Sequence, residues 1–415
     1  MKTETISHGV QQRITTALFV SQSLFSAAII AAFTLMPIIA AELSGNDSTA
    51  GYPSTLSLIG RAAAAYPIGW IMDRAGRRWG LTLGYGLSVL GSIVAVWSIV
   101  AGSFVGFCVG ALLVGFGRSS SEQGRYVAAE VYPAARRAKV IGLIVFAGTI
   151  GAVGGPLLVD PSGQLAARYD MPTAAGPFVI ATVLYLLALL VAFLFLRPDP
   201  LDIGRTIAQT DIDQANPETE RPLRQIFSKP LVQLAVASMV IGQLVMVLLM
   251  TITPLHMNHH NHGTQAISFV IMAHTLGMFG LSSVTGWLID KYGRIVMIVI
   301  GALVLILSSV MTPFAATVPL LAAALFLLGL GWNFCFVAGS SLLSDALTAD
   351  ERGRAQGAGE VLVALAAGTG SFSTGSVFAH GGITAVSAVG LAFSLALVGI
   401  LVWHNASRRL QHVEA

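Results

Sequence analysis

Long apolar runs alternate with short polar breaks along nearly the whole chain. Each run is about as long as the roughly 20 apolar residues that a helix needs to cross the hydrocarbon core of a bilayer. The pattern therefore predicts an all-α integral membrane protein with twelve transmembrane helices. The twelve runs cover residues 14–42, 51–72, 79–101, 104–129, 140–160, 174–196, 230–255, 265–289, 295–314, 317–345, 356–379 and 384–403.

The composition agrees with a lipid environment. Of the 415 residues, 55% are hydrophobic and only 10% are charged, whereas about 25% charged residues is normal for a soluble domain. Disordered chains and disulfide scaffolds are excluded by the same figures. The loops contain no nucleophile motif and no phosphate-binding loop, so we expect no enzyme activity, no cofactor and no nucleic-acid partner.

The basic residues predict the orientation. If the twelve runs are correct, all but four of the 23 Lys and Arg residues fall on one side of the membrane. Loops on the cytoplasmic side retain Lys and Arg, so we expect both termini to be cytoplasmic, in a bacterial inner membrane. The first run is too long for the core of a signal peptide and should stay attached. The four exceptions are Arg61, Arg118, Arg125 and Arg168.

A polar stretch divides the chain. Residues 198–229 form the longest interruption between apolar runs and are expected to be a cytoplasmic linker. The flanking segments, 1–197 and 230–415, are each expected to form a bundle of six helices.

The two halves resemble one another. Four short segments of the first half recur in the second half, in the same order and about 215 residues later. Such a repeat predicts two bundles related by a two-fold axis along the membrane normal. The paired segments are Thr34–Pro37 with Thr251–Pro254, Gly69–Arg77 with Gly286–Arg294, Gly115–Gly117 with Gly329–Gly331, and Arg137–Gly142 with Arg352–Gly357.

The segment GWIMDRAGRR at residues 69–78 resembles the signature of the major facilitator superfamily. With the second copy, the repeat and the twelve runs, the resemblance covers the whole chain and implies a transporter of two six-helix bundles. It also implies a cytoplasmic latch, whose ion pairs form in one arrangement of the bundles and break in the other. The alternative is that these charges only enforce topology. The latch residues would be Gly69, Asp73, Arg74, Gly76, Arg77, Arg78 and Glu130, with Asp290 and Arg294 in the second copy.

A second resemblance lies in run 140–160. Gly142, Gly151, Gly155 and Pro156 are spaced as in a motif associated with proton-coupled drug antiporters of this superfamily. The glycine pair that usually ends the motif is missing at Val159 and Asp160. Glycines at helical spacing with a proline also make a close packing seam, so helix packing is an equal alternative.

Several charges lie inside the predicted spans. A cation at the bilayer centre costs about 3 kcal/mol on insertion scales, so Arg61 should face a cavity or a partner. Arg118, Glu122 and Arg125 share one helix face. Burial favours a protonated Glu122 and the arginines favour its ionised form, which makes it a proton-carrier candidate, although a permanent ion pair explains it equally well. Arg125 can simply extend toward the cytoplasmic headgroups.

Other polar residues of the spans are candidates with simple alternatives. Glu360 and His274 are further proton-coupling candidates, but an acid is favoured in the first turn of a helix and a lone His more often packs. Arg61 and Arg118 are also expected to line the substrate cavity. The remaining cavity candidates are Gln22, Tyr66, Gln243, Met246, Met250, Trp332 and Asn333.

Methionines and histidines follow one another near residue 256. Thioethers beside imidazoles invite a soft-metal interpretation, with His256, His259, His260 and His262 as weak ligand candidates. A hydrophobic pocket, or helix packing by the flexible methionine side chains, explains the pattern better.

The sequence therefore favours a proton-coupled secondary transporter that exports small apolar or amphipathic compounds. Its partners would be the substrate, protons and membrane lipid, and it would act as a monomer. Uptake of a small anionic solute onto Arg61 and Arg118 is the main alternative, and export of a divalent or soft metal is a further one.

Overall fold

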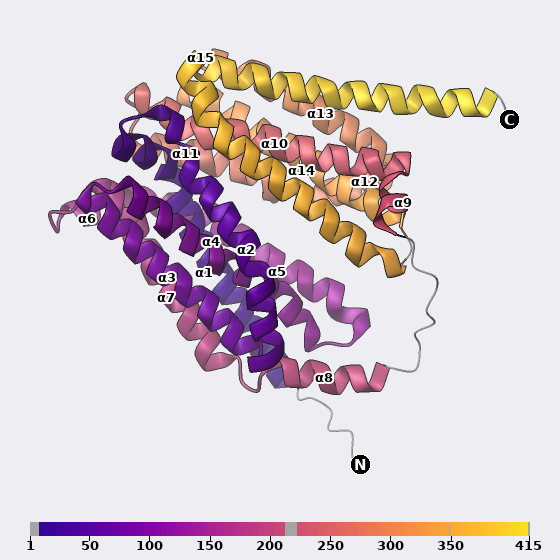
Figure 1. Cartoon of the computed structure of the whole chain (residues 1–415), viewed down its shortest axis with the longest axis horizontal. Coiled ribbons are helices and arrows are strands. Elements are labelled where there is room, and N and C mark those ends of the chain that lie inside the picture. Colours follow the sequence, from indigo (N-terminus) through magenta and orange to yellow (C-terminus); the bar gives the residue numbers. More distant parts are fainter. Residues whose placement is uncertain (1–7, 212–221, 348, 414–415) are drawn as a thin grey trace. The chain divides into compact units, whose positions relative to one another are not determined.

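The computed structural model describes residues 8–211, 222–347 and 349–413 (Figure 1). Within these ranges every regular element is a helix and no strand occurs. The all-α membrane fold predicted from the apolar runs is confirmed.

The contacts divide the chain into two compact units. Unit 1 comprises Met1–Gly45 and Tyr52–Asn216, and unit 2 comprises Asn46–Gly51 and Pro217–Ala415. The short segment Asn46–Gly51 connects two helices of unit 1 but packs with unit 2. In Figure 1 unit 1 runs from indigo to magenta, and unit 2 runs from red to yellow apart from its indigo segment Asn46–Gly51.

Unit 1 is built around α4, which packs against α2, α3 and α5, while α1 packs against α5 and α7. Close approach of α3 and α4 depends on glycine: a Cβ added to Gly91 would lie 2.6 Å from the carbonyl oxygen of Gly110. The helices are α1 (His8–Ser44), α2 (Tyr52–Ala75), α3 (Arg77–Ala101), α4 (Phe104–Glu130), α5 (Ala134–Leu157), α6 (Val159–Ala167), η2 (Thr173–Ala175), α7 (Gly176–Phe195) and α8 (Pro200–Asp211).

Unit 2 has the corresponding arrangement around α14, which packs against α10, α11 and α13, while α10 also packs against α15. Its elements are η1 (Asp47–Thr49), α9 (Leu223–Phe227), α10 (Pro230–His259), α11 (Thr264–Thr275), the π-helical η4 (Leu276–Gly280), α12 (Ser282–Tyr292), α13 (Arg294–Met311), η5 (Thr312–Phe314), α14 (Val318–Asp345) and α15 (Ala349–Val413).

The number of spans depends on how bent helices are counted. Of the described helices, nine are long and apolar enough to cross a membrane, or ten if the bent pair Thr264–Gly280 and Val284–Tyr292 is one span. The stretch Ala358–His404 of α15 enters that count once, although its backbone is not helical at Gly381 and Gly382. Figure 1 shows the bend that this break produces in the yellow helix. Twelve spans therefore stay a prediction.

The internal repeat is visible in the packing. A Cβ on Gly115 of α4 would lie 2.1 Å from the carbonyl oxygen of Ser57 on α2. In unit 2, a Cβ on Gly329 of α14 would lie 2.3 Å from the carbonyl oxygen of His274 on α11. Ser57 and His274 are 217 residues apart and the two glycines 214, so the same pair of helices meets at the same level in both units.

Candidate functional site

A cluster of three charged side chains lies between α2 and α4 of unit 1. Glu122 Oε1 lies 3.1 Å from Nη1 of Arg61 and 3.1 Å from Nε of Arg118. All three side chains keep access to the surface of the structure, at 25% for Arg61, 33% for Arg118 and 40% for Glu122. The cluster therefore joins two guanidinium groups to one carboxylate within the apolar part of the chain.

Helix geometry builds this cluster. Arg118 and Glu122 are four residues apart and meet on one face of α4, as the sequence predicts. Arg61 comes from α2, which α4 approaches closely at Gly115. Arg125, expected on the same face, instead donates from Nη2 to the hydroxyl of Tyr126 at 3.0 Å.

Gln22 of α1 lies next to this part of α4. Its Oε1 accepts a hydrogen bond of 2.8 Å from the hydroxyl of Ser121, the residue before Glu122. One candidate cavity residue is thus adjacent to the charged cluster. Tyr66 of α2 is strongly exposed.

The arrangement has a clear electrostatic consequence. Two cations next to one anion leave a net charge of +1 when Glu122 is ionised, and +2 when it is protonated. Charge-assisted hydrogen bonds favour the ionised carboxylate. Separating Glu122 from either arginine would therefore favour proton uptake.

A second charged cluster lies where α2 ends and α3 begins. Arg77 donates to Glu130 from Nε at 2.8 Å and from Nη2 at 2.7 Å, and to Asp73 from Nη1 at 2.7 Å. Three of the latch residues predicted from the resemblance to the transporter signature, Asp73, Arg77 and Glu130, thus contact one another in unit 1. Arg74 and Arg78 instead stack on Trp70 and Trp79.

Sequence reasoning missed Asp199 at this cluster. Its Oδ1 accepts the backbone N–H of Arg77 at 2.9 Å, and its Oδ2 accepts that of Arg78 at 3.2 Å. Asp199 therefore caps the amino-terminal end of α3 from a distant segment. Gly76, with φ of +105°, permits the turn, and a Cβ there would lie 2.4 Å from Asp199 Oδ2.

Unit 2 repeats the ion pair with different residues. Arg294 Nε lies 2.8 Å from Asp345 Oδ2, in a charge contact without hydrogen-bond geometry. Arg294 follows Arg77 by 217 residues and Asp345 follows Glu130 by 215. The repeat offset could have identified Asp345. Asp290, the counterpart of Asp73, is exposed.

An apolar and aromatic cluster occupies unit 2. Met246, Met278 and Trp332 are buried together, and Met250, Phe279 and Phe336 pack on them. The rings of Trp332 and Phe336 are stacked, with centroids 4.9 Å apart and an angle of 19° between their planes. Gln243 Oε1 accepts the indole N–H of Trp332 at 2.8 Å. Four of the predicted cavity residues, Gln243, Met246, Met250 and Trp332, therefore lie together.

Three other candidates of unit 2 differ in their surroundings. Asn333 is buried beside this cluster, and its amide nitrogen donates to the carbonyl oxygen of Met278 at 2.6 Å. His274 is also buried, with Nδ1 2.9 Å from the carbonyl oxygen of Leu325. Glu360 lies on an exposed face of α15.

The glycine motif of α5 packs on α1. A Cβ on Gly151 would lie 2.1 Å from the carbonyl oxygen of Ser23, and one on Gly155 would lie 2.7 Å from that of Ala27. Gly142 has no such neighbour within 4 Å. Two glycines of the motif thus permit close approach of the helices, and Pro156 follows them near the end of α5.

The histidines at the end of α10 contact one another and η1. The rings of His256 and His260 have centroids 4.4 Å apart, and His259 Nε2 lies 3.5 Å from Asp47 Oδ2. His262 follows in the next loop. In the part of the chain that the structure describes, no group of three or more His, Cys, Asp or Glu residues is arranged to hold a metal ion.

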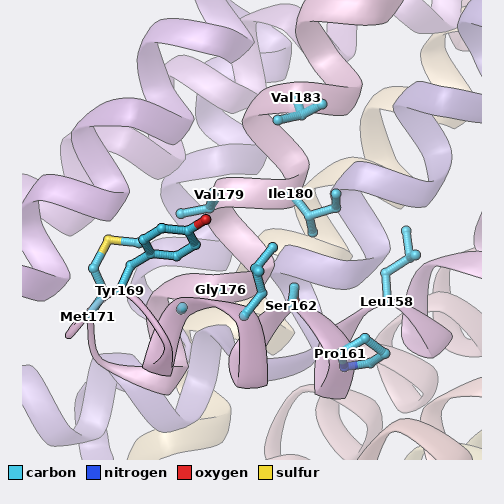
Figure 2. Close-up of a pocket in the computed structure, with 11 residues that line it drawn as sticks. Leu158, Pro161, Ser162, Tyr169, Met171, Gly176, Val179, Ile180 and Val183 are labelled. Atoms are coloured by element: carbon cyan, nitrogen blue, oxygen red, sulfur yellow. The ribbon is translucent and has the colours of Figure 1, made fainter.

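An apolar pocket between α6 and α7 was not predicted. It has a volume of about 280 Å³, and its lining includes Leu158, Tyr169, Met171, Val179 and Val183. Figure 2 shows α6 crossing below α7, with the Tyr169 ring directed toward Val179. No charged side chain lines it, so it differs in chemistry from the Glu122 cluster.

Comparison with known proteins identifies the family. The sequence model of the Major Facilitator Superfamily matches residues 18–371 and 235–413. The chain belongs to this superfamily and is an integral membrane, multi-pass transporter with the alternating-access fold. The family resemblance inferred from residues 69–78 and the expectation that the chain is not an enzyme are confirmed.

Individual relatives cover nearly the whole chain. The MFS-type transporter YdeG of Bacillus subtilis is 35% identical over 386 residues, which are 92% of this chain and 90% of that protein. The riboflavin transporter RfnT of Brucella anthropi is 30% identical over 371 residues, 88% of this chain and 89% of that protein. The crystal structure of the D-xylose–proton symporter has a TM-score of 0.72 at 18% identity, covering 93% of this chain and 96% of that one.

Proposed function

We propose that this transporter is proton-coupled, with Glu122 as the proton carrier, and that it exports small apolar or amphipathic compounds. The observation that supports the proposal is the position of Glu122, 3.1 Å from both Arg61 and Arg118. A carboxylate held by two cations changes protonation when either contact changes. Such a group can couple a proton to a change of conformation, because protonation shifts the balance between states that bind the proton differently.

The cytoplasmic cluster would act as the latch of the cycle. Arg77 contacts both Asp73 and Glu130, and ion pairs of this kind can be formed in one state and broken in another. Asp290 and Arg294 would serve unit 2, where Arg294 contacts Asp345.

Two features favour export. One is the glycine motif of α5, and the other is the set of methionine and aromatic side chains in the apolar cluster of unit 2. Methionine and aromatic side chains suit apolar compounds of varied shape. The relative named as a riboflavin transporter suggests riboflavin, a flat amphipathic molecule, as one compound to test. We further propose that the protein acts as a monomer in a bacterial cytoplasmic membrane, with both termini on the cytoplasmic side.

Uptake of a small anion is a second candidate function. The excess of positive charge in the Arg61, Arg118 and Glu122 cluster favours it, because a bound carboxylate or phosphate could contact the arginines. In that case removal of either arginine should abolish binding.

Proton flux in proteoliposomes tests the proposal. The reconstituted protein is exposed to riboflavin, lipophilic drugs and organic anions while a pH-sensitive dye reports the lumen. We expect a substrate-triggered proton movement that Glu122→Gln abolishes and Glu360→Gln retains. Transport that continues in Glu122→Gln without any loss of proton movement would exclude Glu122 as the carrier. The folding control is the elution profile and thermal unfolding of each variant.

A further inference from the structure

Three arginines of unit 1 surround the end of α7. Arg197 follows the apolar span Thr173–Phe195 by two residues. Arg78 lies in the first turn of α3, and Arg13 lies in α1 directly before the apolar run that begins at Ile14. Because α7 packs against both α1 and α3, three neighbouring helices each place one arginine at this end of the unit.

Direct contacts link these side chains. Arg13 donates from Nη2 to the backbone carbonyl oxygen of Arg197. The guanidinium carbons of Arg78 and Arg197 lie 5.4 Å and 5.7 Å from the centre of the Phe193 ring, and such contacts hold a cation beside a ring. The Trp79 ring meets Phe193 edge-on, with centroids 5.8 Å apart. Arg197 therefore connects the arginine of α1 with the arginine of α3.

No carboxylate neutralises these guanidinium groups. In the part of the chain that the structure describes, no ion pair involves Arg13, Arg78 or Arg197. Asp199 is close along the chain, but its carboxylate accepts three backbone N–H groups. Arg13 and Arg197 are exposed, and Arg78 is half-buried. The three cations are therefore accessible to an anion.

A surface pocket lies beside Arg13, between α1 and α7. It has a volume of about 490 Å³, and Ala17, Val20, Val191 and Phe195 form its apolar wall. Arg13, Ala17 and Val20 follow one another at spacings of four and three residues, so they run along one face of α1 over about 10 Å. The pocket thus joins a cation at the end of the span to an apolar wall within it. A phosphate with an acyl chain has the matching chemistry.

The pocket and the Phe193 ring lie on different sides of α7. Val191 of the pocket is two residues from Phe193, and two residues turn a helix by about 200°. Leu190 and Leu194 are exposed and lie on the face between the two sides. A ligand that contacts arginines on both sides must therefore lie across this leucine face, at the end of an apolar span.

We propose that the end of α7 binds a membrane phospholipid with two phosphates, of the cardiolipin class. One phosphate contacts Arg13 and places an acyl chain in the pocket, and the other contacts Arg78 and Arg197 beside Phe193. A phospholipid with a single phosphate reaches only one of these two sides. Guanidinium groups form strong charge-assisted hydrogen bonds with phosphate, and basic pockets between transmembrane helices bind lipid head groups of this kind.

The orientation of the protein in the membrane does not account for this arrangement. Basic residues near the ends of spans are sufficient to set orientation. Orientation requires neither the pocket beside Arg13 nor a shared aromatic ring between Arg78 and Arg197. The two explanations also differ in their consequences, because only a binding site distinguishes between lipids.

Native mass spectrometry of the full chain in detergent tests the site. Tetraoleoyl cardiolipin is compared with dioleoyl phosphatidylglycerol, which has a single phosphate, and with dioleoyl phosphatidylcholine, which has no net charge. The variants are Arg13→Gln, Arg78→Gln and Arg197→Gln. Arg168→Gln is the matched control, because Arg168 is an exposed arginine near the other end of α7. The elution profile and thermal unfolding of each variant control for folding.

We expect cardiolipin to bind about tenfold or more tightly than phosphatidylglycerol, because its two phosphates are linked, and phosphatidylcholine to bind most weakly. Each of the three variants should weaken cardiolipin about fivefold, the usual contribution of one basic residue at a membrane surface, and Arg168→Gln should leave it unchanged. Equal binding of cardiolipin and phosphatidylglycerol, or losses no larger than in Arg168→Gln, would overturn the proposal. Displacement of cardiolipin by excess glycerol phosphate would also overturn it, since the arginines would then bind a soluble anion.

Filling the pocket tests the acyl-chain site without changing any charge. Val20→Trp places an indole ring in the pocket and should weaken cardiolipin about threefold or more, because less apolar surface is buried on binding. Leu187→Trp is the control, since Leu187 is exposed on α7 and does not line the pocket. Unchanged binding in Val20→Trp would exclude the pocket, even if an arginine variant fails to fold. Glu122→Gln should bind cardiolipin as the unaltered protein does, so the lipid site and the proposed proton coupling can fail separately.

Discussion

Asp199 caps the helix that begins at Arg77, although 122 residues separate them along the chain. Its two carboxylate oxygens accept the first backbone N–H groups of α3, which have no partner within the helix. The segment that leads into α8 is thereby fixed to the residue that forms the ion pairs with Asp73 and Glu130. The cap that Asp199 provides should therefore contribute to the stability of unit 1.

We expect Asp199→Ala to lower the free energy of unfolding by about 1 kcal/mol, the usual cost of losing a capping side chain. Asp202→Ala is the matched control, because Asp202 is an exposed acid three residues further along. Thermal unfolding of the purified protein in detergent measures both. Equal melting temperatures for the two variants would show that the cap adds nothing to stability.

The ion pairs of the two units should differ in strength. Arg77 makes two hydrogen bonds to Glu130 and is mostly buried, whereas Arg294 and Asp345 are more exposed and lack hydrogen-bond geometry. Hydrogen bonds to charged groups contribute about 1.5–3 kcal/mol, and exposed ion pairs about 0–1 kcal/mol. Glu130→Gln should therefore destabilise the protein clearly more than Asp345→Asn.

Urea or thermal unfolding of each single variant and of the double variants Arg77→Gln/Glu130→Gln and Arg294→Gln/Asp345→Asn gives the coupling energies. A coupling between Arg294 and Asp345 as large as that between Arg77 and Glu130 would contradict the prediction.

The α5 glycines should not be equivalent. In Gly151→Ala the new methyl group would lie 2.1 Å from the carbonyl oxygen of Ser23, so α1 and α5 must separate. In Gly142→Ala the methyl group meets no atom within 4 Å, and the change should be neutral or slightly stabilising because alanine favours helices. We expect Gly151→Ala to lose stability and transport, and Gly142→Ala to keep both. Loss of transport in Gly142→Ala with unchanged unfolding would instead indicate a functional role of the motif beyond packing.

The fold was predictable because its signal is local and repeated. Each apolar run is a helix-length segment, and the repeat offset pairs Arg77 with Arg294. The contact between Arg118 and Glu122 was also predictable, because it joins positions four residues apart on one helix. Which helices lie next to one another could be anticipated only from the family resemblance.

Long-range contacts carried no such signal. Arg61 of α2 contacts Glu122 of α4. Their separation along the sequence does not indicate that they are partners. Asp199 looked like part of a polar linker, since an acid before Pro200 is an ordinary start for the following helix. Only packing places it at α3. The apolar pocket between α6 and α7 likewise arises from a turn that the apolar pattern does not resolve.

The contact of Asp47 with His259 should help to hold the segment Asn46–Gly51 in place. His259 Nε2 lies 3.5 Å from Asp47 Oδ2. The segment packs on the rest of unit 2, where Ser371 donates to the carbonyl oxygen of Gly51 at 3.1 Å. Loss of the contact between Asp47 and His259 should therefore expose Ser371 more often.

Ser371→Cys reports this contact, because the Ser371 side chain is buried against Gly51. We expect its modification by a membrane-impermeant thiol reagent, relative to an exposed reference cysteine, to be about two- to fivefold faster when Asp47→Asn or His259→Gln is added, the range that an exposed ion pair allows. Addition of His262→Gln should leave the rate unchanged. An unchanged rate with both Asp47→Asn and His259→Gln would show that this contact does not hold the segment.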